Sequence, residues 1–257
     1  MKKTSGRRPP ERYTDRTYRQ RRIIGDNLTA FRVVCQETDL LIRAERLLKH
    51  EAREKALSCR GHIEGYIQRY PNFATTLVPW KDQALAPAVV RRMIEAAGAA
   101  GVGPMAAVAG AIAECVGRRL LQFSRQVIVE NGGDIFVKTS TPVVAGLFAG
   151  ASPLSMKIGI RVPAVPDGLG LCTSSGTVGH SLSMGRADAV SVVSRSCALA
   201  DAAATAIGNR VRSPRDIKAA IEVGRRIAGV LGIVVVTGRE MGAWGQVEVV
   251  PLNGKKG

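Results

Sequence analysis

Two short apolar runs, residues 126–130 and 134–137, are separated only by Asn131-Gly132-Gly133. Adjacent glycines supply the positive φ angles that a tight turn between two strands requires. The pattern therefore predicts a β-hairpin, with two antiparallel strands side by side near the middle of the chain. Any fold proposed for this chain has to accommodate that hairpin.

The other apolar runs mix strand-like and helix-like patterns. A second hairpin is predicted where Leu28 to Cys35 and Leu40 to Ile42 flank a polar turn at residues 36–39. Further strands are predicted over residues 143–148, 157–162, 169–172, 189–193, 233–236 and 246–250, with a glycine-containing loop over 237–245. Helices are predicted over 43–69, 87–97, a segment ending near 123, 197–209 and 214–231. Without strict βαβ alternation, this order favours an α+β fold over a doubly wound sheet.

The size and composition are those of an ordinary globular protein. The chain has 257 residues, of which 46% are hydrophobic and 23% charged, so wholesale disorder and a coiled coil are excluded. No uncharged apolar run is long enough for a transmembrane helix. Polar residues follow the basic start where a signal peptide would be apolar, so we expect a cytoplasmic protein. Five cysteines without a Cys-x-x-Cys pair indicate reduced thiols.

Positive charge is concentrated at the N-terminus. The formal net charge is +16, and residues 1–22 hold nine Lys and Arg against two acidic residues, a net +7. We expect a flexible basic arm over 1–22, an α+β domain over 23–252 and a short tail over 253–257. Such an arm suits phosphate contacts with nucleic acid. Aromatic residues are only 4%, however, so stacking platforms are lacking, and nucleic acid ranks below the partners considered next.

The hairpin turn is the first of three segments that combine polar side chains with backbone freedom. Gly132 and Gly133 allow the backbone to approach a ligand closely, and Asn131 and Asp134 offer an amide and a carboxylate. The alternative is a plain hairpin turn, since Asn-Gly is a common turn signal. Taken alone, this segment favours the plain turn.

The second segment follows a predicted strand with hydroxyls and glycines. Thr173, Ser174, Ser175 and Gly176 present N–H groups and side-chain oxygens that suit a phosphate or sugar. His180 follows closely and is one of three histidines in the chain. A general acid or base is one role for it, and an ordinary surface or core histidine is the other.

The third segment is an alanine-rich helix with two polar positions. Ser194 or Ser196 is a suitable N-cap, and Asp201 and Thr205 share one helix face because they are four residues apart. Their oxygens could serve as two ligands of a magnesium ion, but a solvated polar face is the simpler interpretation. A cysteine in the first turn, Cys197, would have a lowered pKa if it were exposed.

These three segments, in this order, together with Met105 to Cys115, resemble the ApbE-like superfamily, which includes the FAD:protein FMN transferases. The Ala-Asp-x-x-Ala-Thr run at 200–205 is the most specific match. The likeness extends further to a cytoplasmic, largely uncharacterised branch through residues 38–42, 130–136, 179–183 and 186–189. The resemblance implies a T-fold-related α+β domain of mixed antiparallel sheets with packed helices.

The resemblance also implies roles for individual residues. Asp201, Thr205 and the backbone carbonyl of Ala109 take the positions of the magnesium ligands. The turn and loop residues would line a pocket for FAD or a related nucleotide: Asn131, Gly132, Gly133, Asp134, Thr173, Ser174, Ser175 and Gly176. His180 takes the catalytic position near the pyrophosphate. The implied function is magnesium-dependent binding and cleavage or transfer at that pyrophosphate, with an acceptor protein and a homo-oligomer left open as partners.

Two departures from the transferases leave a second function open. Ala109-Gly110-Ala111 lacks the usual Lys-Gly, and His180 is followed by Ser181-Leu182-Ser183 instead of Asp-Pro. The branch has been linked with anaerobic sulfur metabolism, so the resemblance also allows an accessory role in sulfide assimilation towards homocysteine, without flavin transfer. Cys172 and Cys197 would be its reactive thiols if they are exposed, and would be inert if they are buried in apolar surroundings.

Overall fold

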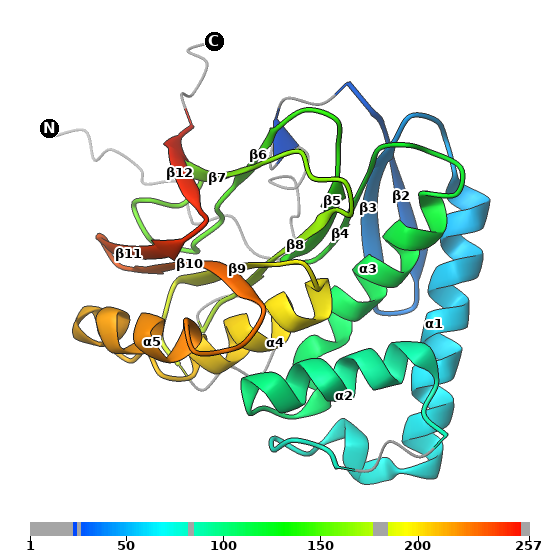
Figure 1. The fold of residues 1–257 in the computed structure, drawn as a ribbon, viewed down its shortest axis with the longest axis horizontal. Coiled ribbons are helices and arrows are strands. Elements are labelled where there is room, and N and C mark those ends of the chain that lie inside the picture. The colour runs from blue at the N-terminus through cyan, green and yellow to red at the C-terminus, as the bar shows by residue number, and fades with distance from the viewer. Residues whose placement is uncertain (1–22, 25–26, 82–84, 177–184, 253–257) are drawn as a thin grey trace, which may run out of the picture.

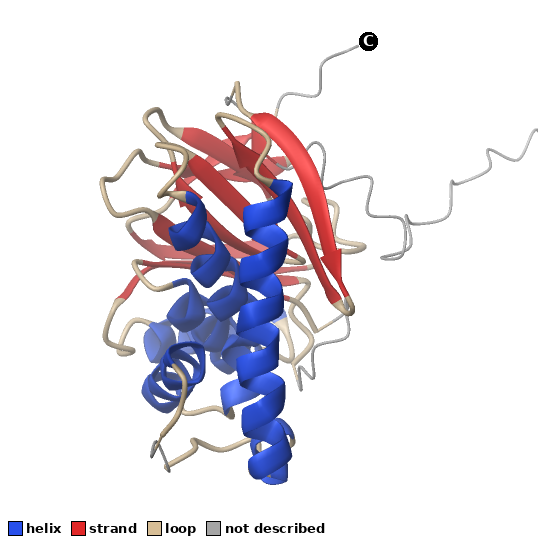
Figure 2. Ribbon diagram, turned by 90° about the vertical axis from the view of Figure 1, so that its right-hand side faces the viewer, coloured by secondary structure: helices blue, strands red, loops and turns tan. Residues whose placement is uncertain are grey.

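The computed structural model describes residues 23–252 except 25–26, 82–84 and 177–184. They form three layers: a small sheet, a large sheet, and helices gathered on the far side of the large sheet (Figures 1 and 2). The predicted arm 1–22, the tail 253–257 and His180 lie outside the described residues.

The large sheet has eight antiparallel strands in the order β11-β10-β9-β8-β5-β4-β3-β2. Their bounds are β2 Thr29–Cys35, β3 Thr38–Ala44, β4 Val127–Asn131, β5 Asp134–Lys138, β8 Leu169–Ser174, β9 Ala189–Ser194, β10 Val230–Thr237 and β11 Glu240–Gly245. Both predicted hairpins are present, as β2–β3 and β4–β5. Consecutive strands are neighbours over most of the sheet, which is the usual result of short antiparallel connections.

The small sheet contains β1 Ile23–Ile24, β6 Val143–Gly146, β7 Ile158–Val162 and β12 Glu248–Pro251, in the order β1-β6-β7-β12. The opposite face of the large sheet carries α1 Lys49–Arg69, α2 Ala88–Ala100, α3 Val108–Leu120, α4 Cys197–Gly208 and α5 Ile217–Gly224. The described residues also form three short 3-10 turns. Turn η2 Pro71–Ala74 follows α1, η3 Pro104–Ala107 precedes α3, and η4 Pro214–Asp216 precedes α5. The mixed α+β class predicted from the sequence is confirmed.

Alternation along the central strands creates two separate cores. In β10, Ile233 and Val235 belong to the helix-side core, whereas Val234 and Val236 belong to the core beneath the small sheet. Successive side chains of a strand point to opposite faces, so one apolar run supplies both cores. This explains why the central strands read as continuous apolar runs, a pattern that is usual in sheets covered on both sides.

Three predicted boundaries are wrong, each for a tertiary reason. Helix α1 begins at Lys49 and not at residue 43, because Arg43 and Ala44 pair with both β2 and β4. Helix α5 ends at Gly224, because the chain turns at Gly229 (φ +91°) and enters β10. The predicted loop over 237–245 contains an edge strand, β11, which follows the turn at Gly238.

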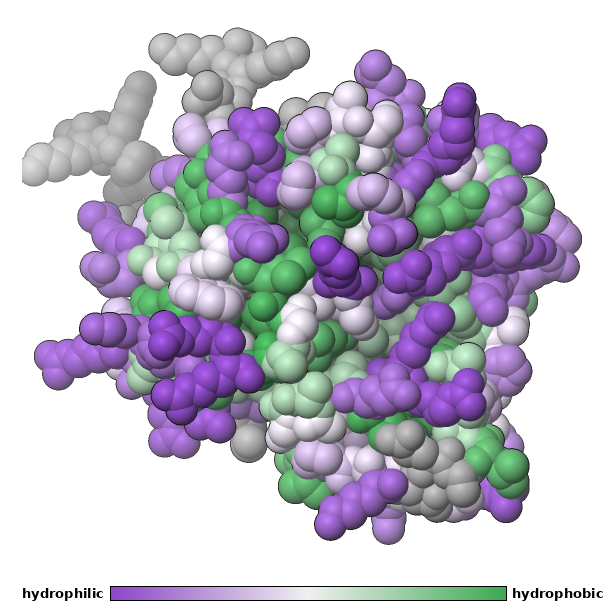
Figure 3. Space-filling model, in the orientation of Figure 1, coloured by the Kyte–Doolittle hydropathy of each residue, from purple (hydrophilic) through white to green (hydrophobic). Residues whose placement is uncertain are grey.

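In the described part of the chain, no single helix is long and apolar enough to cross a membrane. The bent pair Ala88–Ala100 and Pro104–Leu120 meets the length and composition criterion only when both helices are counted together. Hydrophilic side chains are spread over the face seen in Figure 3, with smaller apolar areas between them.

Candidate functional site

The β4–β5 turn lies against the end of β8. Thr173 donates its backbone N–H to the carbonyl of Gly133 (3.2 Å), and a Cβ at position 133 would come within 2.5 Å of the Thr173 carbonyl oxygen. Gly133 is therefore required for close approach of two strands, and Gly132 has the positive φ of +69°. The first two predicted segments are therefore adjacent, at one end of the central strands of the large sheet.

The same turn contacts the start of α3. The Asn131 side chain donates through Nδ2 to the carbonyl oxygen of Ala109 (3.1 Å). Ala109 lies in the first turn of α3, 22 residues earlier in the chain. This contact joins the β4–β5 turn to the N-terminal end of α3.

Asp201 connects α4 to this cluster. Its Oδ2 accepts the backbone N–H of Gly110 (2.9 Å), also in the first turn of α3. Burial of the carboxylate, followed by the negative charge of Asp134, raises the pKa of Asp201 well above its ordinary value, although the N–H groups of Gly110 and Ala109 oppose this. Two carboxylates from different segments therefore repel each other at one place, and Asp201 is not on a solvated polar face.

Two hydroxyl-bearing residues, Thr173 and Ser174, end strand β8. The Thr173 and Ser191 hydroxyls are 2.8 Å apart and hydrogen-bonded. The Ser174 hydroxyl is buried and makes no hydrogen bond within the described part of the chain. A buried polar atom of this kind is uncommon and is a natural contact for a ligand.

The remaining predicted residues lie further along the loop and α4. Thr205 is partly buried, one helical turn after Asp201. Gly176 donates its N–H to the carbonyl of Ala187 (2.9 Å), so the chain turns back towards β9 after Ser175. The cluster formed by Ala109, Asn131, Asp134, Thr173 and Asp201 is called the carboxylate cluster below.

A third carboxylate, Glu114, joins the same two helices and was missed in the sequence analysis. Glu114 of α3 is only 4% exposed, and its Oε2 accepts the N–H of Cys197, the first residue of α4 (2.9 Å). The two helices are therefore joined in both directions. Asp201 of α4 accepts an N–H from the first turn of α3, and Glu114 of α3 accepts the N–H of the first residue of α4. Carboxylates are favourable there because the first N–H groups of a helix have no partners within it. A lone Glu within the apolar run over residues 108–117 was the available signal.

Glycines allow these helices to approach. A Cβ at Gly110 would overlap the Cys197 carbonyl and lie 2.9 Å from the Asp201 Cβ, and a Cβ at Gly170 would overlap the Cys197 backbone. Of the two candidate N-cap residues, Ser194 and Ser196, the second caps α4: its hydroxyl accepts the N–H of Leu199 (3.2 Å).

The two cysteines of the sulfur hypothesis are inside the molecule. Cys172 and Cys197 are both 0% exposed, and their sulfur atoms are 3.5 Å apart. Burial raises the pKa of both thiols. The sequence analysis left open whether these thiols are exposed and reactive or buried and inert. The structure shows them buried.

We expect Glu114→Ala to lower the free energy of unfolding by about 1–3 kcal/mol, because it leaves the buried Cys197 N–H without a partner. The matched control is Glu222→Ala, which removes an exposed ion pair to Arg225 (3.0 Å) and should change stability by less than about 1 kcal/mol. Urea unfolding curves measure both. Equal losses in the two variants would show that Glu114 does not stabilise α4.

The carboxylate cluster has the chemistry that a magnesium ion requires. Mg²⁺ is usually held by one or two carboxylates together with substrate phosphates and water. Asp201, the Ala109 carbonyl and the Thr205 hydroxyl are oxygen donors, and Asp134 adds a second negative charge. The described residues contain no group of three or more His, Cys, Asp or Glu placed to hold a metal. Such a site would therefore depend on backbone, hydroxyl and ligand oxygens.

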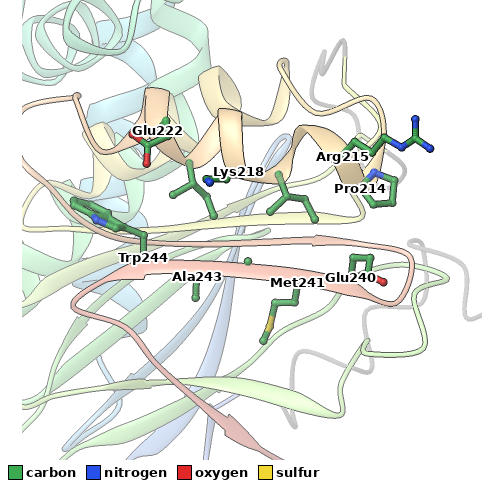
Figure 4. Close-up of a pocket in the computed structure, with 11 residues that line it drawn as sticks. Pro214, Arg215, Lys218, Glu222, Glu240, Met241, Ala243 and Trp244 are labelled. Atoms are coloured by element: carbon green, nitrogen blue, oxygen red, sulfur yellow. The ribbon is translucent and has the colours of Figure 1, made fainter.

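A separate groove of about 450 Å³ lies between α5 and β11 (Figure 4). Trp244 lies on the α5 side of the strand, whereas Met241 and Ala243 point to its other face. None of the predicted site residues lines this groove.

A family model described as "AbpE bacteria" matches residues 21–238. A UPF0280 protein of Methanococcus aeolicus is 44% identical over 201 residues, which cover 76% of this chain and 81% of the relative. A UPF0280 protein of Methanocaldococcus jannaschii is 40% identical over 222 residues, which cover 84% and 90%.

Solved structures of ApbE flavin transferases have the same fold. The apo form of Pseudomonas stutzeri flavinyl transferase ApbE aligns with a TM-score of 0.55 and 14% identity, covering 86% of this chain and 94% of that one. Flavin transferase ApbE of Vibrio cholerae aligns with a TM-score of 0.54 and 12% identity, covering 85% and 97%. At this identity the likeness concerns the fold.

Proposed function

The chain belongs to the family described as AbpE bacteria, and on this premise we propose that it binds FAD or a related nucleotide with Mg²⁺ and cleaves or transfers at the pyrophosphate. The flavin transferases that share its fold make a flavin nucleotide the first ligand to test. The carboxylate cluster is the proposed site, and the hydroxyl groups of β8 are the proposed contacts to the nucleotide.

One observation carries the proposal: the charge of Asp134 acts on Asp201 where the Asn131 amide and the Ala109 carbonyl also meet. Two partly desolvated carboxylates are unfavourable together, because each raises the cost of ionising the other. A divalent cation would remove that cost. This arrangement therefore supports a cation site better than it supports a plain hairpin turn.

In this proposal Asp201, Thr205 and the Ala109 carbonyl would hold Mg²⁺, which would neutralise charge developing on the phosphoryl oxygens. The chain itself would position the nucleotide. Gly132, with its positive φ, is proposed to let the turn approach the nucleotide closely, and the buried Ser174 hydroxyl is the proposed hydrogen-bond partner. His180 is proposed as the proton donor or acceptor at the pyrophosphate.

We expect FAD with Mg²⁺ to raise the melting temperature and to release FMN or AMP, detected by chromatography. Ligand binding stabilises the folded state by linkage, so the shift should grow with FAD concentration. FMN tests the flavin without the pyrophosphate, and ADP-ribose tests the pyrophosphate without the flavin.

The pattern of responses decides the proposal. A response to FAD that needs Mg²⁺ and exceeds those to FMN and ADP-ribose supports it. A shift with ADP-ribose equal to that with FAD would assign the site to another nucleotide diphosphate. The absence of any response to flavin nucleotides, with or without an acceptor protein, would overturn the flavin function.

A further inference from the structure

A second pocket, of about 300 Å³, lies among α1, α2 and α3, on residues that the proposed function does not use. Two cysteines from different helices line it, Cys59 of α1 and Cys115 of α3. We call it the thiol pocket. Cys59 is 1% exposed, whereas Cys115 is partly exposed, so a small reagent in the pocket meets Cys115 first.

The thiol pocket is rich in positive charge. Four cations line it, Lys55 of α1, Arg92 of α2 and Arg118 and Arg119 of α3, together with the His62 imidazole, and its described lining contains no carboxylate. Two of these cations already have other contacts. Arg118 donates to Glu114 (2.8 Å), and Arg119 lies over the Phe123 ring. Lys55 and Arg92 remain as the cations that act on Cys115.

The two thiols and the Lys55 ammonium line the same pocket, and Cys59 and Lys55 both act on the pKa of Cys115. The Cys59 thiol, followed by the charges of Lys55 and Arg92, lowers the pKa of Cys115 to about 6, whereas the Cys115 neighbour and burial raise the pKa of Cys59. The Cys115 thiol therefore ionises more readily than an ordinary cysteine, next to a thiol that ionises less readily. A thiolate is the nucleophilic form of cysteine, and an adjacent thiol is placed to resolve its oxidised product.

We propose that Cys59 and Cys115 are a redox-active pair, in which a hydroperoxide oxidises Cys115 and Cys59 then closes a disulfide. The Cys115 thiolate attacks the outer peroxide oxygen and breaks the O–O bond, giving a sulfenic acid and an alkoxide or hydroxide that takes a proton from water. The Cys59 sulfur then attacks the sulfenic sulfur. Its proton and the sulfenic hydroxyl leave as water, so the peroxide is reduced by two electrons and the thiols are oxidised by two.

The chain carries its own control. The sulfur atoms of Cys172 and Cys197 are 3.5 Å apart, but both residues are fully buried and face the negative charges of Asp134 and Asp201. Their pKa values are raised by burial. Proximity alone would oxidise both pairs, whereas the proposal predicts oxidation only in the thiol pocket.

The test uses the reduced full-length protein. It is treated with a small excess of hydrogen peroxide, quenched with N-ethylmaleimide, digested and mapped by mass spectrometry. We expect a Cys59–Cys115 cross-linked peptide, two hydrogens lighter than the reduced pair, while Cys172 and Cys197 are modified only after denaturation. Oxidation of Cys115 without the cross-link, cross-linking of both pairs alike, or no oxidation would each overturn the proposal.

Two further measurements separate the roles. In Cys59→Ser, a sulfenic acid at Cys115 should persist and react with dimedone. In the wild-type protein at about pH 6, Cys115 should be alkylated about tenfold faster than in the urea-unfolded chain, since its larger thiolate fraction outweighs its lower nucleophilicity. Lys55→Gln should reduce that ratio, and Lys218→Gln, in the groove beside α5, should not. Equal alkylation rates in folded and unfolded protein would contradict the assignment of Cys115.

Discussion

Asp201→Asn is expected to abolish magnesium-dependent stabilisation and FAD cleavage while leaving the fold intact. The amide retains an oxygen to accept the Gly110 N–H (2.9 Å in the wild type), but it removes the charge that the proposed cation needs. We expect at least an approximately 100-fold loss of Mg²⁺ affinity. Melting curves with magnesium and with a chelator measure it, and equal magnesium shifts in both proteins would reject the metal assignment.

The pH dependence of the same variant provides an independent check. The folded-state pKa of Asp201 is raised, so its contribution to stability is greatest below the unfolded pKa and is lost as pH rises through the folded value. Without divalent cations this contribution is therefore smaller at neutral than at acidic pH, and Asp201→Asn should be relatively more stable at neutral pH.

Asp216 gives the opposite sign and serves as the control. It also accepts backbone N–H groups, from Arg212 (3.0 Å) and Ser213 (2.8 Å), but these hydrogen bonds lower its pKa. Its stabilising effect is present above the unfolded pKa and is lost as pH falls through the folded value. Asp216→Asn should therefore destabilise the protein at neutral pH, with or without magnesium.

Gly110→Ala is expected to separate α3 from α4 and to lower the free energy of unfolding by about 1–3 kcal/mol or more. The added Cβ overlaps the backbone carbonyl of Cys197, which belongs to a helix start and has little room to move. Because the change also displaces Asp201 from α3, the response to magnesium should weaken. Urea unfolding measures the stability and the thermal shift measures the response.

Gly98→Ala is the matched control for this prediction. Gly98 lies in α2, and a Cβ there would meet nothing within 4 Å. Alanine has a higher helix propensity than glycine, so this variant should gain about 0.5–1 kcal/mol. If both variants were stabilised alike, the close contact between α3 and α4 would be refuted.

Much of the fold could be predicted because its signals are local. The Asn131-Gly132-Gly133 turn forms the β4–β5 hairpin, and Ser196 caps α4 through a residue three positions away. The errors arose where a distant partner decided the outcome. Residues 240–245 carry two glycines and form an edge strand only because β10 is available to pair with them.

The same division applies to the functional residues. The spacing of Asp201 and Thr205 placed both on one helix face, but a solvated face and a ligand site look identical from that spacing. Only the tertiary structure brings the Gly110 N–H, 91 residues earlier in the chain, onto the Asp201 carboxylate, together with the charge of Asp134.

By itself, the sequence determined the α+β class, the hairpins, the helix caps and the family, since these depend on apolar periodicity, turn chemistry and short motifs. The tertiary structure alone decided which charges and thiols face one another. Glu114 meets the start of α4 across 83 residues, and Cys59 meets Cys115 across two packed helices. The physical reason is that burial and electrostatic contacts act through space, where residues far apart in the chain become neighbours only once the sheet and the helices have packed.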